Sequence, residues 1–201
     1  MPTMPPLVLA SSSPWRQDLL TRLGLPFECA SPEIDETPAP REPAPALVER
    51  LARSKAEALS DRYPNHLIIG SDQVATLDGI ILGKPGNHEN ACRQLALCSG
   101  RTVTFHTGLA LHDSASGATD ALEESFRVHF RPLPRETIER YLRIEQPYQC
   151  AGSFRMEGLG IVLFSRLEGR DPNTLIGLPL IALVDMLQRR GVDTLEYANP
   201  E

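Results

Sequence analysis

The sequence predicts an α/β fold with a mixed sheet, and two features of its pattern support this prediction. Short apolar runs typical of buried strands alternate with longer segments in which apolar residues recur at helical spacing. Tight turns such as Asp78-Gly79 also join neighbouring apolar runs, and this dipeptide favours a hairpin. A helix between two strands suits parallel pairing, whereas a hairpin makes the pairing antiparallel. The expected sheet therefore contains both kinds of strand pair.

Residues 7–24 show how the elements are recognised. The apolar run 7–10 predicts a strand, and it stops at Ser11-Ser12-Ser13-Pro14, where a serine can cap a helix and proline suits the first turn. That helix should end at Gly24, because glycine adopts the left-handed closing conformation at little cost. The other expected strands span residues 27–30, 67–70, 74–77, 80–82, 102–111, 123–130 and 160–164. The other expected helices span residues 45–63, 87–98, 134–145 and 178–190.

Length and composition favour one domain over residues 1–201. The 201 residues are 41% hydrophobic, enough for a single large core or for two lobes that share one. A net charge of −6 opposes binding to a nucleic acid polymer, which needs a basic face. No apolar run approaches the roughly 20 residues of a membrane span, and the N-terminus does not resemble a secretion signal. We therefore expect a cytoplasmic protein that has no membrane partner.

The four cysteines point away from a structural metal or a disulfide framework. Cys29, Cys92, Cys98 and Cys150 form no CxxC pair and share no ligand-like spacing with the five histidines. Buried free thiols are the expectation at these positions.

The segment from Ser11 to Arg16 is the first candidate for function. It opens a helix directly after a strand, so its hydroxyls and free backbone N–H groups can hold a phosphate, and Arg16 adds positive charge and a fork of donors. A serine helix cap beside a surface arginine is the competing structural interpretation.

Carboxylates form the second candidate. Glu33, Asp35 and Glu36 share a short acidic loop, and Asp72 follows the apolar run 67–70, where a strand end can face a cleft. Oxygen ligands of this kind suit Mg²⁺ or Mn²⁺ bridging a polyphosphate, and Asp72 could also position or deprotonate an attacking water. A solvated acidic loop explains the first three residues equally well.

Two lysines and a turn-rich loop complete the candidates. Lys84 is held in Gly83-Lys84-Pro85, and Lys55 lies within the expected helix 45–63. Fixed ammonium groups can neutralise a triphosphate during displacement, although each lysine taken alone is explained by a solvated side chain. The loop 168–179 either lets its backbone approach a ligand closely through its glycines or simply connects two elements.

These segments together resemble the Maf family of nucleotide pyrophosphatases. The resemblance covers nearly the whole chain, and the motifs recur in the family's order and approximate spacing. The segments that carry it are Ser11 to Arg16, Asp35-Glu36, Lys55, Ser71-Asp72-Gln73, Gly83-Lys84-Pro85, Ala151-Gly152 and Gly177-Leu178-Pro179.

The resemblance implies a two-lobed, inosine-triphosphatase-like α/β fold with a strongly twisted sheet and a deep cleft. It implies hydrolysis of a nucleoside triphosphate to a monophosphate and pyrophosphate with a divalent metal, Mg²⁺ or Mn²⁺. Asp72 matches the proton acceptor, and Asp35, Glu36 and Asp72 match positions that help to hold the metal. The residues that match phosphate-binding positions are Ser11, Ser13, Arg16, Lys55 and Lys84. A homodimer is compatible with the sequence, which does not decide the oligomeric state.

Departures from the common family pattern point to a subgroup. Trp15 replaces the first of two arginines, Gln73 stands where threonine is usual, and Glu157 stands where relatives that cleave UTP and dTTP carry glutamine. Gln149-Cys150 also replaces an aspartate-lysine pair. Together these substitutions resemble the subgroup that hydrolyses 7-methyl-GTP.

The chemistry of the side chains at these positions suits the base of 7-methyl-GTP. Methylation at N7 leaves guanine cationic, and a cation on an indole gains about 0.5–2 kcal/mol. Trp15 is the only tryptophan, and it would supply that face unless it is a core aromatic. Glu157 can accept hydrogen bonds from the guanine N1–H and amino group, and Gln73 can add a further donor or acceptor.

Two alternatives remain beside this hypothesis of a housekeeping enzyme for modified nucleotides. The same reaction on another base, such as UTP, dTTP or another modified nucleotide, requires only a different fit around the base. A non-catalytic nucleotide-sensing module in cell-division control would bind nucleotide without needing Asp72.

Overall fold

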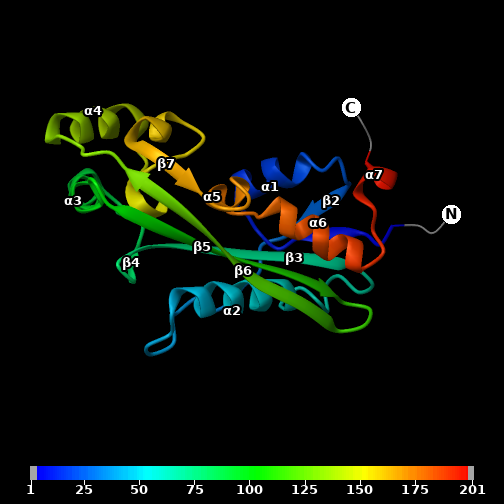
Figure 1. Ribbon diagram of the computed structural model, residues 1–201. Helices are drawn as coiled ribbons and strands as arrows, with labels where there is room; N and C mark the ends of the chain where they lie inside the picture. The colour runs from blue at the N-terminus through cyan, green and yellow to red at the C-terminus, as the bar shows by residue number, and fades with distance from the viewer. Residues whose placement is uncertain (1–3, 199–201) are drawn as a thin grey trace.

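A seven-stranded mixed sheet organises the fold, which a computed structural model describes over residues 4–198 (Figure 1). The strand order is β2-β1-β3-β5-β6-β7, and β4 pairs with β3 outside this path. β1 runs parallel to β2 and β3, and the remaining pairs are antiparallel, so the predicted mixed sheet is confirmed. The strands are β1 Leu7–Leu9, β2 Phe27–Cys29, β3 Leu67–Leu77, β4 Ile80–Leu82, β5 Thr102–Asp113, β6 Ala118–Phe130 and β7 Phe164–Glu168.

Helices cover both faces of this sheet. In Figure 1, α2 lies on one face, α1, α5 and α6 lie on the other, and α3 and α4 pack at the far end. The helices are α1 Pro14–Thr21, α2 Ala44–Glu57, α3 His88–Cys98, α4 Arg135–Glu145, α5 Asn173–Ile176, α6 Leu180–Arg189 and α7 Thr194–Tyr197. Two 3₁₀ segments are η1 Ala151–Ser153 and η2 Leu159–Leu163. Among residues 4–198, no helix combines the length and apolar character that a membrane crossing requires.

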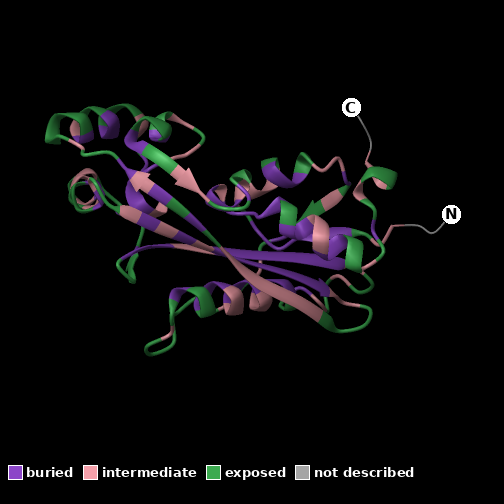
Figure 2. Ribbon diagram, viewed as in Figure 1, coloured by how far each residue is buried: buried purple, intermediate pink, exposed green. Residues whose placement is uncertain are grey.

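The apolar runs at residues 7–10 and 67–70 arise because both faces of the sheet are covered there. Successive side chains of a strand point to opposite faces. Leu7 and Leu9 accordingly pack in the core beneath α1 and α6, while Val8 between them packs in the core beneath α2. This explains why the expected strands 7–10 and 67–70 show runs rather than alternation. Figure 2 shows the resulting buried centre of the sheet.

A third core lies at the other end of the sheet and includes side chains from α3 and α4. Phe130, Phe154 and Phe164 meet there edge to face, with ring centroids 4.8–5.7 Å apart. We call this end, with α3, α4, η1 and η2, the outer lobe, and the end with α1, α2 and α6 the main lobe. β3, β5 and β6 contribute to both, so the two lobes share one sheet.

The prediction that Asp72 follows the end of a strand is wrong. The expected strands 67–70 and 74–77 form one strand, β3, in which Ser71, Asp72 and Gln73 pair with Leu109, Gly108 and Thr107 of β5. Polar side chains interrupt the apolar pattern here, but backbone pairing does not depend on side-chain polarity. Asp72 therefore projects from the rigid middle of the sheet.

The expected strand 160–164 is also wrong. Residues Leu159–Leu163 form a 3₁₀ segment, and the strand β7 begins only at Phe164. A short apolar run cannot by itself distinguish a strand from a buried helical turn. The predicted hairpin at Asp78-Gly79 is confirmed, because both residues have positive φ, as its turn type requires.

Two glycines let α2 lie directly on the sheet. A Cβ at Gly70 would stand 2.1 Å from the Ala52 carbonyl oxygen, and one at Gly108 would stand 1.9 Å from the Val48 carbonyl oxygen. Both clashes are with helix backbone, which cannot rotate away as a side chain can. Small residues at these positions therefore set the distance between α2 and the strands β3 and β5.

Gly108→Ala should destabilise the protein by about 1–3 kcal/mol, because the added methyl group forces α2 away from β5. Gly83→Ala is the matched control, since a Cβ at Gly83 meets nothing within 4 Å. Urea unfolding followed by circular dichroism measures both changes. Equal stability of the two variants would show that α2 does not depend on this close approach.

Candidate functional site

Two adjoining cavities form one continuous cleft between the main and outer lobes. The first, of about 520 Å³, contains the carboxylates and is called the acidic cavity; the second, of about 260 Å³, is called the tryptophan cavity. Four residues line both: Ser13, Arg16, Gln73 and Lys84. A single extended ligand can therefore reach from one cavity into the other.

Most candidate residues from the sequence meet in this cleft. The predicted residues that line the acidic cavity are Ser11, Ser13, Arg16, Glu36, Lys55, Asp72, Gln73 and Lys84. Those that line the tryptophan cavity include Trp15, Gln73 and Glu157. Glu33 and Asp35 line neither cavity. The Asp35 carboxylate instead accepts a hydrogen bond from the Thr37 amide at 2.9 Å, and bonding to Thr37 holds the Asp35 pKa below its usual range.

Lys55 joins two carboxylates in the acidic cavity. Its Nζ lies 2.7 Å from Asp72 Oδ1 and 2.8 Å from Glu36 Oε1. Lys55 lies in the last turn of α2, where the helix dipole favours a cation. The side chains of Lys55 and Asp72 are almost buried, whereas Glu36 is largely exposed. The cavity thus contains a buried ion pair with a third, exposed charge at its edge.

The loop that carries Glu36 is anchored to α2 by a second ion pair. Arg50 donates two hydrogen bonds to Glu42, at 2.6 and 2.8 Å, and one to the Thr37 carbonyl at 3.2 Å. The hydrogen bond from Arg50 is the main reason why the Glu42 pKa falls to about 2. This anchor fixes both ends of the segment between Glu36 and Glu42.

The start of α1 faces the cleft with unused donors. A serine, Ser13, is the N-cap residue as expected, but its side chain makes no capping bond, which argues against the competing interpretation of a simple serine cap. Its own N–H donates to Ser11 Oγ at 3.1 Å. Within residues 4–198 no acceptor bonds the amides of Trp15 and Arg16. Free amides at a helix N-terminus favour an anion.

Arg16 is held by the loop 168–179. Its Nε donates to the Gly177 carbonyl oxygen at 2.9 Å, and Ser71 Oγ donates to the same oxygen at 2.8 Å. Gly177 has φ of 121°, a conformation that favours glycine, and a Cβ there would also lie 3.3 Å from Arg16 Nε, so that side chain would have to shift slightly. The loop is therefore more than a connector. Burial lowers the pKa of Arg16, while Asp72 and Glu36 act to raise it, and the guanidinium stays charged.

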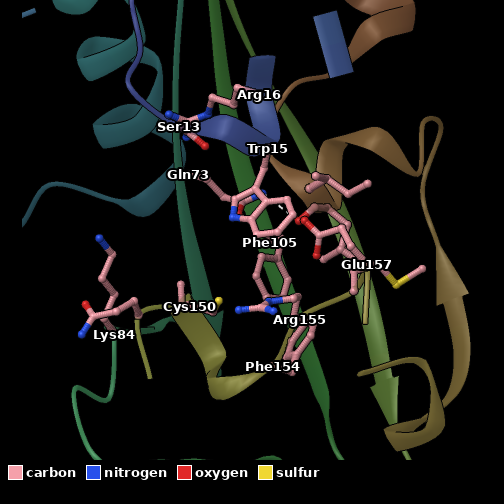
Figure 3. A pocket seen from close by; sticks show the side chains of 15 residues that line it. Ser13, Trp15, Arg16, Gln73, Lys84, Phe105, Cys150, Phe154, Arg155 and Glu157 are labelled. Atoms are coloured by element: carbon pink, nitrogen blue, oxygen red, sulfur yellow. Dashed lines mark hydrogen bonds between the residues drawn. The ribbon is translucent and has the colours of Figure 1, made fainter. Parts of the chain in front are cut away.

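Trp15 is not a core aromatic. It is 39% exposed and hangs from α1 into the tryptophan cavity (Figure 3). Phe105 and Phe154 supply apolar walls to the same cavity, and Glu157 lies at its other side from Lys84. An aromatic face, apolar walls and a carboxylate together suit a flat polar ring.

Gln73 enters the cleft as an acceptor. Its Nε2 donates to the Thr174 carbonyl oxygen at 2.7 Å and to Thr107 Oγ1 at 2.9 Å. Because a carbonyl oxygen can only accept, the bond to Thr174 fixes which end of the amide is nitrogen. No donor of the described chain bonds the Gln73 side-chain oxygen, so that atom is available to a ligand.

Arg155 is a cleft residue that the sequence did not indicate. Its guanidinium carbon lies 5.4 Å from the centre of the Trp15 ring, within the range of a cation–π contact. Its Nε is buried and has no hydrogen-bond partner among the described residues. The only sequence signal was its place four residues after Ala151, within a segment whose role was not assigned.

Comparison with known proteins now identifies the family. Residues 6–190 match the family model described as Maf-like protein. The chain belongs to the Maf-like protein family. Members of this family are nucleoside triphosphate pyrophosphatases, so this protein is a hydrolase that acts on a nucleoside triphosphate.

Solved structures are similar in fold. A HAM1 protein from Coxiella burnetii matches with a TM-score of 0.54 at 15% identity, covering 92% of this chain and 100% of that one. The Ham1 protein of Staphylococcus aureus matches with a TM-score of 0.47 at 15% identity, covering 63% of this chain and 72% of that one. At this identity the likeness to the Coxiella burnetii protein concerns the fold alone, and it agrees with the predicted inosine-triphosphatase-like architecture.

Maf-family pyrophosphatases generally use a divalent metal, and the acidic cavity has suitable donors. Carboxylate oxygens of Glu36 and Asp72 both form ion pairs with the Lys55 ammonium, so they lie close together. Hard oxygen ligands of this kind suit Mg²⁺ or Mn²⁺. Asp35, which lines neither cavity, is not among these donors.

Lys55→Met should lower the free energy of unfolding by about 3 kcal/mol, because it leaves the Asp72 charge buried without a partner. The double variant Lys55→Met/Asp72→Asn should recover part of that loss, since the unpaired charge is gone. Urea unfolding of the wild type, both single variants and the double variant completes a double-mutant cycle. Strictly additive losses would mean that the pair contributes nothing to stability.

Proposed function

We propose that this Maf-family enzyme hydrolyses 7-methyl-GTP to 7-methyl-GMP and pyrophosphate, in a housekeeping role that removes modified nucleotides. The observation that supports this most strongly is the single cavity lined by Trp15, Gln73 and Glu157, next to a cavity with carboxylates and cations. Under this proposal, the base occupies the tryptophan cavity and the triphosphate occupies the acidic cavity.

Two groups at the base end, the Trp15 indole and the Glu157 carboxylate, favour a methylated guanine. N7-methylguanine carries a positive charge that an indole face and a carboxylate both attract. Glu157 and the Gln73 side-chain oxygen are acceptors, and the Watson–Crick edge of guanine presents N1–H and amino donors. Uracil and thymine present one such donor, so they would leave an acceptor unused.

Arg155 has to be accommodated in this arrangement. Its guanidinium lies over the Trp15 face, so a base that stacks on that face must move it. Its unpaired Nε is a donor that could then reach the O6 carbonyl oxygen of guanine. Displacement is feasible because Arg155 lies in a loop and is only partly buried.

Cations and free amides suit the phosphate end. Arg16 and Lys84 line both cavities, between the base and the carboxylates. The Trp15 and Arg16 amides at the start of α1 add donors that need no reorganisation when phosphate binds. Ser11 and Ser13 complete this cradle. These groups would stabilise the charge that builds on the departing pyrophosphate.

Asp72 is proposed to direct the attacking water. Its Oδ1 is bonded to Lys55, while Oδ2 accepts from no group of the described chain and can accept from water. The water oxygen would bond to the α-phosphorus, the α–β anhydride bond would break, and Asp72 would take the water's proton. Glu36 and Asp72 would hold the divalent metal, which when bound would polarise the phosphates.

Asp72→Asn tests this role. We expect kcat to fall by about 10²–10⁴-fold, because asparagine cannot accept the proton of the water. Initial rates of pyrophosphate release at saturating substrate and metal measure the change, and circular dichroism checks the fold. Turnover near that of the wild type in a folded variant would remove Asp72 from the chemistry.

A panel of triphosphates tests the choice of base. We expect the highest kcat/KM for 7-methyl-GTP among 7-methyl-GTP, GTP, UTP and dTTP, with both products identified by chromatography. Trp15→Ala should reduce kcat/KM for 7-methyl-GTP about 2–30-fold more than for GTP, the range that a cation–π contact supplies. Trp15→Phe is the matched control, because it keeps an aromatic face. Equal values for all four substrates would contradict the stacking argument and favour another base.

A further inference from the structure

Three potential metal ligands converge between α3 and α4, outside the catalytic cleft. His88, Cys92 and Glu139 each place one ligand atom so that all three atoms lie within 4.8 Å of one another. His88 and Cys92 stand four residues apart on α3, so they share one face of the helix, and Glu139 faces them from α4. None of the three lines the acidic or the tryptophan cavity.

The imidazole is already oriented as a metal ligand would be. Its Nε2 lies 2.9 Å from Glu139 Oε2, and its Nδ1 lies 3.1 Å from the Tyr148 hydroxyl. In metal sites, the ring nitrogen that does not bind the ion usually bonds to such an outer partner, which fixes the tautomer and the ring. The three ligand residues are partly buried, so the site is sheltered yet open to an ion from solvent.

The ligand set selects the class of ion. A thiolate, an imidazole and a carboxylate suit Zn²⁺ and similar transition metals, whereas Mg²⁺ prefers oxygen ligands alone. Three protein ligands leave a fourth tetrahedral position for water. We propose that His88, Cys92 and Glu139 form a Zn²⁺ site that clips α3 to α4 in the outer lobe. This site is separate from the proposed Mg²⁺ or Mn²⁺ site of the cleft and does not depend on the proposed substrate.

Two arginines compete for the Glu139 carboxylate, but weakly. Arg135 Nε lies 3.9 Å from Oε1 and Arg143 Nη2 lies 3.8 Å from Oε2. Their side chains are 92% and 75% exposed, so both can turn into solvent when an ion arrives. A cavity of about 550 Å³ adjoins the ligands and gives the ion a route of entry.

Equilibrium dialysis of the full chain against Zn²⁺, with metal measured by mass spectrometry, tests the site. We expect the wild type to bind about one Zn²⁺ per chain more than the Cys92→Ser variant binds. Serine keeps the shape of the cysteine side chain but removes the sulfur ligand. Tyr148→Phe should weaken this binding by about 10–100-fold through loss of the outer partner alone. Cys29→Ser is the matched control, because Cys29 is an exposed thiol on β2, and it should bind as the wild type does.

Substitution with Co²⁺ gives a second measurement. A thiolate bound to Co²⁺ produces a near-ultraviolet charge-transfer band, which we expect in the wild type and Asp72→Asn but not in Cys92→Ser. The Asp72→Asn arm separates this site from the acidic cavity. The proposal would be overturned if the wild type and Cys92→Ser took up equal amounts of Zn²⁺. It would also be overturned if the Co²⁺-substituted wild type lacked the charge-transfer band. Thermal melting without metal verifies that each variant folds.

Discussion

The contact between Lys55 and Asp72 is the interaction on which the cleft depends. It exists because α2 lies directly on the sheet at Gly70 and Gly108, which brings its last turn over the middle of β3. A charge pair that is nearly buried tolerates little displacement, because either partner alone would stand unpaired in a poorly solvated place. The packing of α2 on the sheet therefore also fixes the geometry of the site.

The cleft also explains how an acidic protein can hold a polyanion. The chain carries a net charge of −6, yet Arg16, Lys55 and Lys84 gather along one cavity system. Free amides at the start of α1 add partial positive charge there, where the helix dipole reinforces it. Local concentration of cations, rather than overall charge, makes the site suitable for phosphate.

The two lobes divide the work in a way that the shared sheet makes possible. β3 carries Ser71, Asp72 and Gln73 through the centre, so the residues proposed for positioning, chemistry and base contact lie on one central strand. The outer lobe adds Lys84, Arg155 and Glu157 from loops, which can adjust to a ligand. The candidate groups of the outer lobe thus lie on loops, whereas those of β3 lie within the sheet.

The sequence by itself determined the α/β class, the hairpin at Asp78-Gly79 and five of the seven α-helices in residues 4–198, because period and turn chemistry are local properties. Most of the candidate site residues that it named also line the cleft. Only the tertiary structure decided that Asp72 lies within β3, that residues 159–163 are 3₁₀, and that Asp35 does not line the cavity. The expected burial of the thiols held for Cys98 alone, and Arg155 and the His88–Cys92–Glu139 cluster gave no recognised signal. The physical reason is that the decisive contacts join segments far apart in the chain: β3 pairs with β5 through Asp72, and Glu139 reaches His88 from α4. A short apolar run such as 159–163 also fits a strand and a helical turn equally well.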